Sequence, residues 1–268
     1  MSIRRPVPPV LAAAAIAAAL FLALPRAAAP VDGRETLRGT VTTVYDGDTI
    51  RVRLAGSADE KVRLIGIDSP ELDDGREAVR MMAFLAKRFA FSRLYQAEVE
   101  LLPGPEARDA YGRLLAFVRL AGGEMFNVTL VREGYAFAFL KFPFDESLRK
   151  ELKAAEAQAR RDGRGLWRKE PYPVVGAGEA GRREGEILTV RFLCLRSVKR
   201  GSFRLLEADG ADFDAAIPAD VFRSLPGPLD FEGRTVEATG LVETYKGRPQ
   251  IVIGVPVQLK RLGAKETR

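Results

Sequence analysis

Three short segments rich in Val, Thr, Ile and Leu follow one another at 38–45, 49–55 and 61–66. Asp46-Gly47 lies between the first two segments, and Gly56-Ser57-Ala58-Asp59 lies between the next two. Runs of this length and composition are typical of β-strands, and Asp-Gly pairs are typical of tight hairpin turns. Because connections this short join neighbouring antiparallel strands, we predict a three-stranded meander.

Helical and strand-like patterns follow the meander. Apolar residues recur at helical spacing over 76–89, 125–133 and 145–161, and Gly163 closes the last of these segments. Segments 97–102 and 113–120 return to strand character. This order predicts a small β-rich barrel of the α+β class over residues 36–170.

A second strand-rich unit is predicted over residues 185–262. Prolines and glycines give 171–184 the composition of a linker. Beyond it, 187–196 and 203–207 form one predicted hairpin, 219–224 a helical turn, and 234–245 with 249–259 another hairpin. Two hairpins around a helical turn fit a second, smaller OB-like β-barrel with five strands.

The N-terminus has the composition of an export signal. Arg4 and Arg5 precede an apolar run over 10–24, and Ala27-Ala28-Ala29 offers a cleavage site of small residues. The run is short for a membrane span, so we predict a signal peptide at 1–29 and a periplasmic or secreted protein. If the segment is retained, it is instead an N-terminal membrane anchor. We expect the protein to be a monomer.

The composition of the 268 residues narrows the chemistry, because the chain has no histidine. Zinc sites built on histidine, serine or cysteine triads, and nucleases with a histidine base are therefore excluded. Loss of 1–29 removes Arg4, Arg5 and Arg26 and lowers the formal net charge from +6 to +3. A nucleic acid would have to be held by a local basic patch. The single Cys194 lies in an apolar stretch and is predicted to be buried.

Carboxylates and arginines gather in the turns and strand ends of the first unit. Carboxylates suggest a hard metal such as calcium or magnesium, and arginines suggest an anion site, so the combination indicates metal-assisted attack on a phosphodiester. Taken singly, Asp46-Gly47 is also a common hairpin turn, and 68–71 could cap the segment that follows. The motifs are Asp46-Gly-Asp48-Thr49, Arg63-Leu-Ile-Gly-Ile-Asp68-Ser69-Pro70-Glu71 and Asp109-Ala-Tyr111-Gly-Arg113.

These motifs, in this order, resemble the staphylococcal (micrococcal) nuclease or thermonuclease family over residues 37–169. Ala155-Glu-Ala-Gln-Ala159 and Gly165-Leu-Trp167 resemble the last helix of that family and its trailing tryptophan. The resemblance implies a five-stranded OB-type barrel with three helices. It also implies calcium-dependent cleavage of DNA or RNA to 3′-phosphate products.

The resemblance assigns a role to each site residue. It implies that Asp48, Asp68 and the main-chain carbonyl of Ser69 bind Ca²⁺, with Mg²⁺ or Mn²⁺ as alternatives. It also implies that Glu71 activates the attacking water. The remaining implied roles are orientation of the metal shell by Asp46, binding of the scissile phosphate by Arg63 and Arg113, and lining of the phosphate pocket by Tyr111.

The chain departs from the family pattern around these residues. The loop after Glu71 is only Leu72-Asp-Asp-Gly75, and Ala110 stands where a lysine precedes the pocket tyrosine. Two tyrosines that contact the nucleotide in the family align with Leu140 and Phe142. We therefore expect weaker base preference and weaker processing from chain ends than internal cutting.

The second unit carries cations in the two loops with which OB barrels commonly bind oligonucleotides. One loop has Lys199 and Arg200, and the other has Lys246 and Arg248, so we predict that these residues contact nucleic acid. Exposed turns also attract Lys and Arg without a ligand. As an alternative to catalysis, the chain is a nucleic-acid-binding or envelope scaffold protein, like the degenerate repeats of Tudor staphylococcal-nuclease proteins.

Overall fold

The predicted meander is the start of a closed barrel. The structure is a computed structural model that describes residues 35–55 and 58–264, so the predicted signal segment 1–29 lies outside the described residues. Strands β1, β2 and β3 are antiparallel neighbours, and the barrel closes in the order β1-β2-β3-β6-β5. β3 and β6 run parallel. The strands are β1 (Leu37–Val44), β2 (Thr49–Leu54), β3 (Asp59–Leu64), β5 (Glu98–Arg108) and β6 (Leu114–Leu120).

Three helices pack against this barrel: α1 (Glu77–Leu94), α2 (Phe126–Arg132) and α3 (Glu146–Asp162). Helix α1 continues beyond the predicted end at 89 because Ala90 and Leu94 extend its buried face. Helix α3 begins where the Asp145 side chain accepts hydrogen bonds from two backbone N–H groups, and it ends at Gly163, whose φ is +62°. Two short strands, β4 (Ile67–Asp68) and β7 (Phe137–Ala138), form a separate small sheet, and η2 (Gly165–Trp167) follows α3.

The second unit is a barrel with the same strand order. Its strands pair as β9-β10-β11-β13-β12, and β12 also pairs with β9, which closes the barrel. β11 and β13 run parallel, as β3 and β6 do in the first barrel. Its elements are β9 (Ile187–Arg200), β10 (Phe203–Ala208), β11 (Asp214–Pro218), α5 (Ala219–Ser224), β12 (Arg234–Tyr245) and β13 (Arg248–Val252). Cys194 is buried in its core, as predicted.

Two details of the second barrel differ from the sequence prediction. Strand β11 was not anticipated, because Asp214-Ala-Ala is short and poor in β-branched residues. The predicted strand over 249–259 is broken into β13, η4 (Pro256–Gln258) and β14 (Leu259–Ala264). Pro256 lacks a backbone N–H for pairing, and the buried Gln258 side chain accepts hydrogen bonds from the backbone N–H groups of Gly254 and Val255. Strand β14 then pairs with β12.

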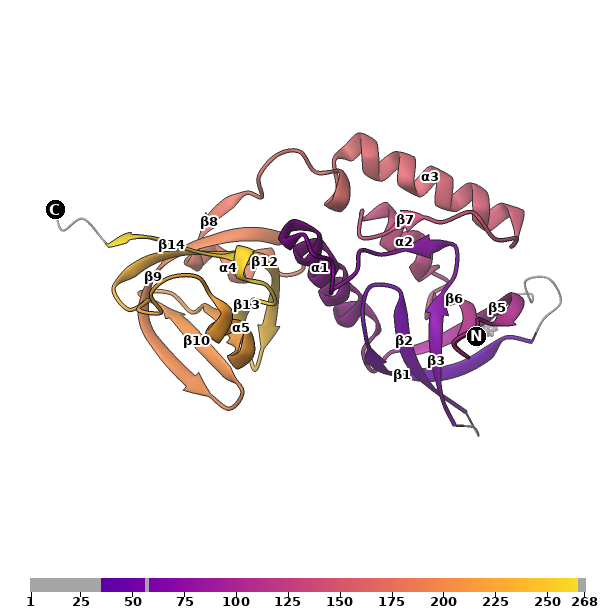
Figure 1. Ribbon diagram of the computed structural model, residues 1–268, viewed down its shortest axis with the longest axis horizontal. Helices are drawn as coiled ribbons and strands as arrows, with labels where there is room; N and C mark the ends of the chain where they lie inside the picture. The colour runs from indigo at the N-terminus through magenta and orange to yellow at the C-terminus, as the bar shows by residue number, and fades with distance from the viewer. Residues whose placement is uncertain (1–34, 56–57, 265–268) are drawn as a thin grey trace, which may run out of the picture.

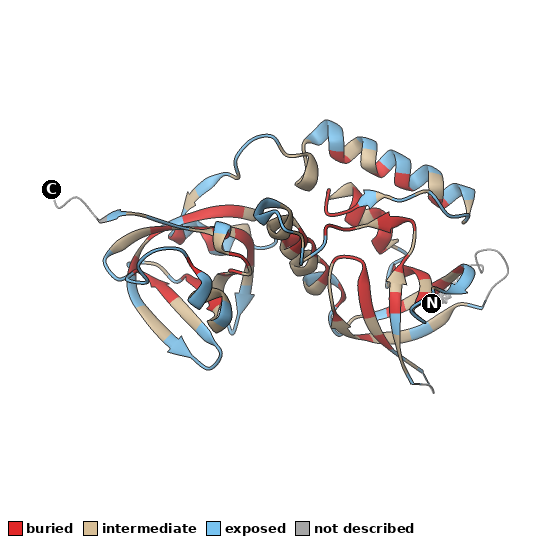
Figure 2. Ribbon diagram, viewed as in Figure 1, coloured by how far each residue is buried: buried red, intermediate tan, exposed pale blue. Residues whose placement is uncertain are grey.

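The stretch expected to be a linker, 171–184, contains β8 (Val174–Gly176), α4 (Ala177–Ala180) and η3 (Gly181–Arg183). β8 pairs in parallel with β9, and Ala177 and Ala180 lie in the core of the second barrel. Helix α1 lies between the two barrels (Figure 1), each of which has its own buried interior (Figure 2). Among the described residues, no helix is long and apolar enough to cross a membrane.

Candidate active site

The β1–β2 turn holds the first two candidate residues in fixed positions. The Asp46 carboxylate accepts a hydrogen bond from the backbone N–H of Asp48 at 3.0 Å. The backbone carbonyl of Asp48 accepts one from the N–H of Leu64 at 2.8 Å, which joins the turn to β3. Gly47 lies so close to Ser69 that an added Cβ would be 2.8 Å from the Ser69 Cβ. The turn therefore requires glycine at this position.

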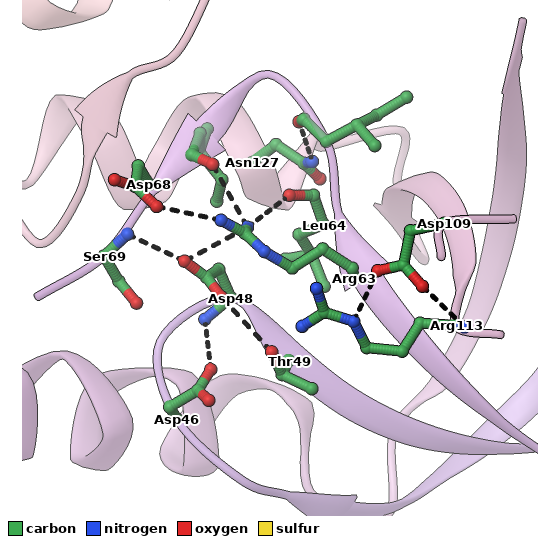
Figure 3. Close-up of polar contacts among 12 residues, drawn as sticks. Asp46, Asp48, Thr49, Arg63, Leu64, Asp68, Ser69, Asp109, Arg113 and Asn127 are labelled. Carbon is green, nitrogen blue, oxygen red and sulfur yellow. Dashed lines mark hydrogen bonds and ion pairs between the residues drawn. The ribbon is translucent and has the colours of Figure 1, made fainter. Parts of the chain in front are cut away.

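Arg63 lies between the two predicted metal ligands Asp48 and Asp68 (Figure 3). One terminal nitrogen is 3.1 Å from Asp48 Oδ2, and the other donates to Asp68 Oδ1 at 2.9 Å. The guanidinium also donates to the carbonyls of Leu64 and Ile67 at 2.8 and 3.1 Å. Asp48 is 5% exposed and accepts the backbone N–H of Ser69 at 2.7 Å, whereas the Asp68 side chain is 51% exposed. The local fold thus brings Asp48, Arg63, Asp68 and Ser69 together.

The second arginine is held by the loop between β5 and β6. Arg113 donates from Nε to Asp109 Oδ2 at 2.6 Å, and the other oxygen of Asp109 accepts the backbone N–H groups of Tyr111 and Arg113. Burial tends to raise the pKa of Asp109, but these bonds outweigh it and hold the pKa below its ordinary value. Tyr111 is 85% exposed, and its ring lies beside the Arg113 guanidinium. Asp109 therefore fixes the direction of Arg113.

Both arginines line one pocket of about 420 Å³ between the barrel and the segment after β7. Apolar and aromatic side chains also line the pocket, among them Phe139 and Phe142, whose rings pack edge to face. Phe142 is 54% exposed. The family resemblance predicts fewer nucleotide contacts here, and that expectation stays a prediction. Two exposed aromatic rings line the same pocket as the arginines. Such a pocket has a cationic side for a phosphate and a flat apolar side for a base.

The carboxylates on the other side of Arg63 carry excess negative charge. Burial, followed by the neighbouring Asp46, raises the pKa of Asp48 to about 6, although Arg63 opposes the shift. Burial, Asp46 and Asp68 likewise raise the pKa of Glu71 above its ordinary value. Glu71 therefore lies close enough to Asp46 and Asp68 for their negative charge to act on it.

These acidic residues fit a hard divalent cation in donor chemistry, because every side chain available is an oxygen donor. The carboxylates do not form a closed coordination shell for an ion. Within 35–55 and 58–264 no three acidic, histidine or cysteine side chains are grouped closely enough to hold an ion. Asp48 and Asp68 each form an ion pair with Arg63. Ser69, which follows Asp68 in the sequence, donates its backbone N–H to the Asp48 carboxylate.

The predicted contact residues of the second barrel differ in their surroundings. Arg200 donates to Glu207, which also pairs with Arg196, and Arg248 pairs with Asp212 and Asp214. Lys199 and Lys246 are exposed at the tips of the two hairpins. Lys246 adopts a φ of +52° in its tight turn. Both arginines are therefore held in ion pairs, whereas neither lysine forms an ion pair with another described residue.

One supporting residue was not anticipated from the sequence. Asn127 of α2 is fully buried, accepts the backbone N–H of Val118 at 2.9 Å and donates to the carbonyl of Ile65 at 2.8 Å. It thereby ties the end of β3, which carries Arg63, to β6, which follows Arg113 (Figure 3). A polar residue inside the apolar run Met125-Phe-Asn-Val was the available signal.

Known proteins match the part of the chain that holds the first barrel. The family model for staphylococcal nuclease homologues matches residues 61–169. The thermonuclease of Staphylococcus intermedius is 39% identical over 127 residues, which cover 47% of this chain and 74% of that protein. Endonuclease YhcR of Bacillus subtilis is 30% identical over 169 residues, 60% of this chain but 14% of that protein. An uncharacterized endonuclease of Escherichia coli is 33% identical over 133 residues, 49% of this chain and 77% of that protein.

The fold and site define an OB-barrel protein in which two arginines lie beside a group of carboxylates. The chain belongs to the staphylococcal nuclease family. The second barrel extends beyond the residues that the family model matches.

Proposed function

We propose that this protein is a nuclease that cuts DNA, with RNA as a second substrate, in a calcium-dependent reaction that leaves 3′-phosphate ends. The observation that carries the proposal is the position of Arg63. It lines the same pocket as Arg113 and also contacts Asp48 and Asp68. The names of the similar thermonucleases and endonucleases support the same reaction class.

In this proposal the two arginines bind the scissile phosphate. Negative charge grows on the phosphate oxygens during in-line attack, and planar guanidinium groups match two oxygens at once where lysines would not. Arg113 is held by Asp109 through Nε and lines the pocket. Loss of one such contact removes a few kcal/mol of transition-state stabilisation, or roughly a hundredfold in rate.

Glu71 is the proposed general base, and Asp48, Asp68 and the Ser69 carbonyl are the proposed calcium ligands, with Asp46 orienting the turn. When bound, the cation would lower the pKa of a nearby water and offset phosphate charge. Glu71 lies in the acidic region and has no hydrogen-bond partner among the described residues that would occupy its carboxylate. It is thus available to accept a proton from an attacking water.

Plasmid digestion by the purified protein tests this function. We expect cleavage with calcium, little or none with chelator, and a loss of at least a hundredfold in Glu71→Gln. Magnesium and manganese replace calcium in parallel reactions to identify the metal. Cleavage that persists in chelator, or in Glu71→Gln at the wild-type rate, would contradict the proposal. Binding without any cleavage would favour the alternative of a nucleic-acid-binding scaffold.

We further propose that Phe139 and Phe142 contact a base next to the scissile phosphate, because both line the pocket that holds the arginines. Tyr111 is not among the residues that line this pocket, but its exposed ring lies beside Arg113. We also propose that the protein cuts within nucleic-acid chains. Comparing products from linear and end-blocked DNA tests this point, and purely terminal release would contradict it.

The second barrel is proposed to bind the same nucleic acid through Lys199 and Lys246, assisted by Arg200 and Arg248. Its two hairpin tips are exposed, and they occupy the loops that OB barrels use for oligonucleotides. Export is a further proposal and depends on residues 1–29. Sequencing the N-terminus of the protein recovered outside the cytoplasm tests it, and an intact Met1 would indicate an anchor.

A further inference from the structure

Helix α1 lies between the two barrels (Figure 1). Ala83, Ala86, Ala90 and Leu94, spaced by three or four residues, are fully buried on one face. Glu77, Phe84 and Arg88 are spaced by seven and four residues and therefore share another face. Because α-helices turn about 100° per residue, Ala86 and Arg88 point in nearly opposite directions. The helix is therefore packed on both sides.

The face with Phe84 and Arg88 contacts the second barrel. A Cβ added to Gly254 would lie 2.1 Å from the Phe84 ring, so the backbone after β13 passes directly against that ring. Arg88 forms a two-point ion pair with Glu243 of β12, with Nε 3.1 Å from Oε1, and both side chains are largely buried. Glu77 accepts the backbone N–H of Val257 at 3.0 Å. Apolar packing, charge and hydrogen bonding thus all join α1 to this barrel.

The face with Ala86 contacts the β1–β2 turn of the candidate active site. A Cβ on Gly47 would lie 3.0 Å from the Ala86 Cβ and 2.8 Å from the Ser69 Cβ. Gly47 separates Asp46 from Asp48, so the helix surface sets how deeply this turn can lie. A displacement of α1 on its second-barrel side is therefore transmitted to the carboxylates on the other side.

We propose that the second barrel positions the Asp46–Asp48 turn through α1, with Phe84, Arg88, Glu243 and Gly254 as positioning residues. The kinetic consequence of this proposal rests on the proposed nuclease function. Displacing a positioned group by about 1 Å costs up to a hundredfold in rate. Loosening the α1 contact lowers kcat, whereas KM for DNA, set by the arginine pocket and the basic loops, stays within about twofold.

Four variants separate positioning from general destabilisation. Glu243→Arg places a cation against Arg88 in a half-buried contact, and Arg88→Glu/Glu243→Arg restores opposite charges. Glu237→Arg is the matched control, because Glu237 lies on the same strand, has the same 14% side-chain exposure as Glu243 and pairs with Arg191 inside the second barrel. Phe84→Ala removes the apolar contact without a charge change, and it serves if Glu243→Arg does not fold.

Hydrogen exchange of the backbone N–H groups of Asp48 and Leu64, measured without metal or nucleic acid, tests positioning directly. We expect exchange about tenfold faster in Glu243→Arg and Phe84→Ala, and near wild-type rates in the double reversal and in Glu237→Arg. In plasmid cleavage we expect kcat to fall about tenfold in the same two variants and to recover in the double reversal.

The outcomes distinguish the two proposals. Unchanged exchange at Asp48 and Leu64, with wild-type kcat in folded Glu243→Arg and Phe84→Ala, would overturn the positioning role and leave the nuclease function intact. A wild-type protein that does not cut DNA with calcium would overturn the nuclease function, while the exchange result would still decide whether the second barrel positions the turn. Equal effects in Glu237→Arg would also overturn the positioning role.

Discussion

The two barrels share one strand order but use their arginines differently. In the first barrel, Arg113 precedes β6 and Arg63 lies on β3, and both line an open pocket. In the second barrel, Arg248 begins β13 at nearly the same topological place, but it pairs with Asp212 and with the buried Asp214 on β11. The comparison shows that OB topology brings these strand ends together in both barrels and that arginines pair with acids in both. Arg63 and Arg113 in addition line one shared pocket.

The loops show the same contrast. The β1–β2 turn of the first barrel carries Asp46 and Asp48 and meets Arg63. The corresponding β9–β10 turn of the second carries Lys199 and Arg200, and Arg200 is held by the buried Glu207. We therefore expect catalysis in the first barrel alone, with binding and stability effects in the second.

The largest expected effect follows from removing an arginine of the pocket in the first barrel. Arg113→Ala should lower kcat by roughly a hundredfold or more, because phosphate charge in the transition state loses a two-point partner. Arg113→Lys should recover little, since an ammonium cannot contact two oxygens in the same plane. Single-turnover cleavage of a labelled duplex measures both. Arg191→Ala, on the outer face of β9, is the control and should cut at the wild-type rate.

A smaller effect, on stability, is expected from Arg248→Ala. Its loss leaves the buried Asp214 carboxylate without its cation, at a cost of about 1–3 kcal/mol after allowance for the exposure of the arginine. Asp214→Asn in the same background should recover part of the loss. Chemical denaturation followed by circular dichroism measures the difference. A variant as stable as wild type would show that the pair contributes nothing.

The pH dependence of that variant has a definite sign. Burial already raises the pKa of Asp214 above its ordinary value, and Arg248 opposes the rise, so removing the arginine should raise the pKa further. A folded pKa above the unfolded one favours folding below the unfolded pKa, and this contribution is lost as pH rises through the folded pKa. The stability deficit of Arg248→Ala should therefore shrink on going from pH 7 to pH 4.

A loss of substrate affinity is expected from changes to the aromatic residues of the pocket in the first barrel. Phe142→Ala should raise KM several-fold, because stacking of a base on an aromatic ring contributes about 1–3 kcal/mol. kcat should change less, since the ring does not contact the reacting phosphate. Phe142→Tyr keeps the ring and should behave like wild type. A fall in kcat at unchanged KM would assign Phe142 to the support of the arginines instead.

The smallest effect is expected at the exposed lysines of the second barrel. Lys199→Ser/Lys246→Ser should weaken DNA binding several-fold and reduce the dependence of affinity on salt concentration by up to about two ion contacts. Fluorescence anisotropy at several salt concentrations measures this slope. An unchanged slope would leave the second barrel with structural contacts only.

Short-range patterns in the sequence were sufficient to predict the first barrel and the proximity of its site residues. The turn at Asp46-Gly47 and the closely spaced motif from Arg63 to Glu71 leave few ways to separate these residues, so their proximity was predictable. Closure of the second barrel was also predictable from its hairpins, although β11 was missed because Asp214-Ala-Ala resembles a loop. The ion pair between Arg248 and Asp214 depends on that strand, so the sequence patterns did not predict it.

The sequence patterns did not predict the contacts between helix α1 and the second barrel. Phe84 and Arg88 fit an ordinary amphipathic helix with a solvent-facing arginine, and nothing near Glu243 or Gly254 marks them as their partners. Such contacts depend on how two folded units meet, which involves pairs about 155 residues apart in the chain. The aromatic wall of the pocket was hidden for a similar reason, because Phe139 meets Arg63 only after β7 pairs with β4.

The central claim is that cutting occurs at the carboxylate and arginine site of the first barrel. The most direct test is single-turnover cleavage of a labelled DNA by the full chain with saturating calcium, comparing wild type with Glu71→Gln and analysing the product ends. The account predicts 3′-phosphate ends from wild type and a rate at least a hundredfold lower in Glu71→Gln. Equal rates in the two proteins, or products with 3′-hydroxyl ends, would contradict it.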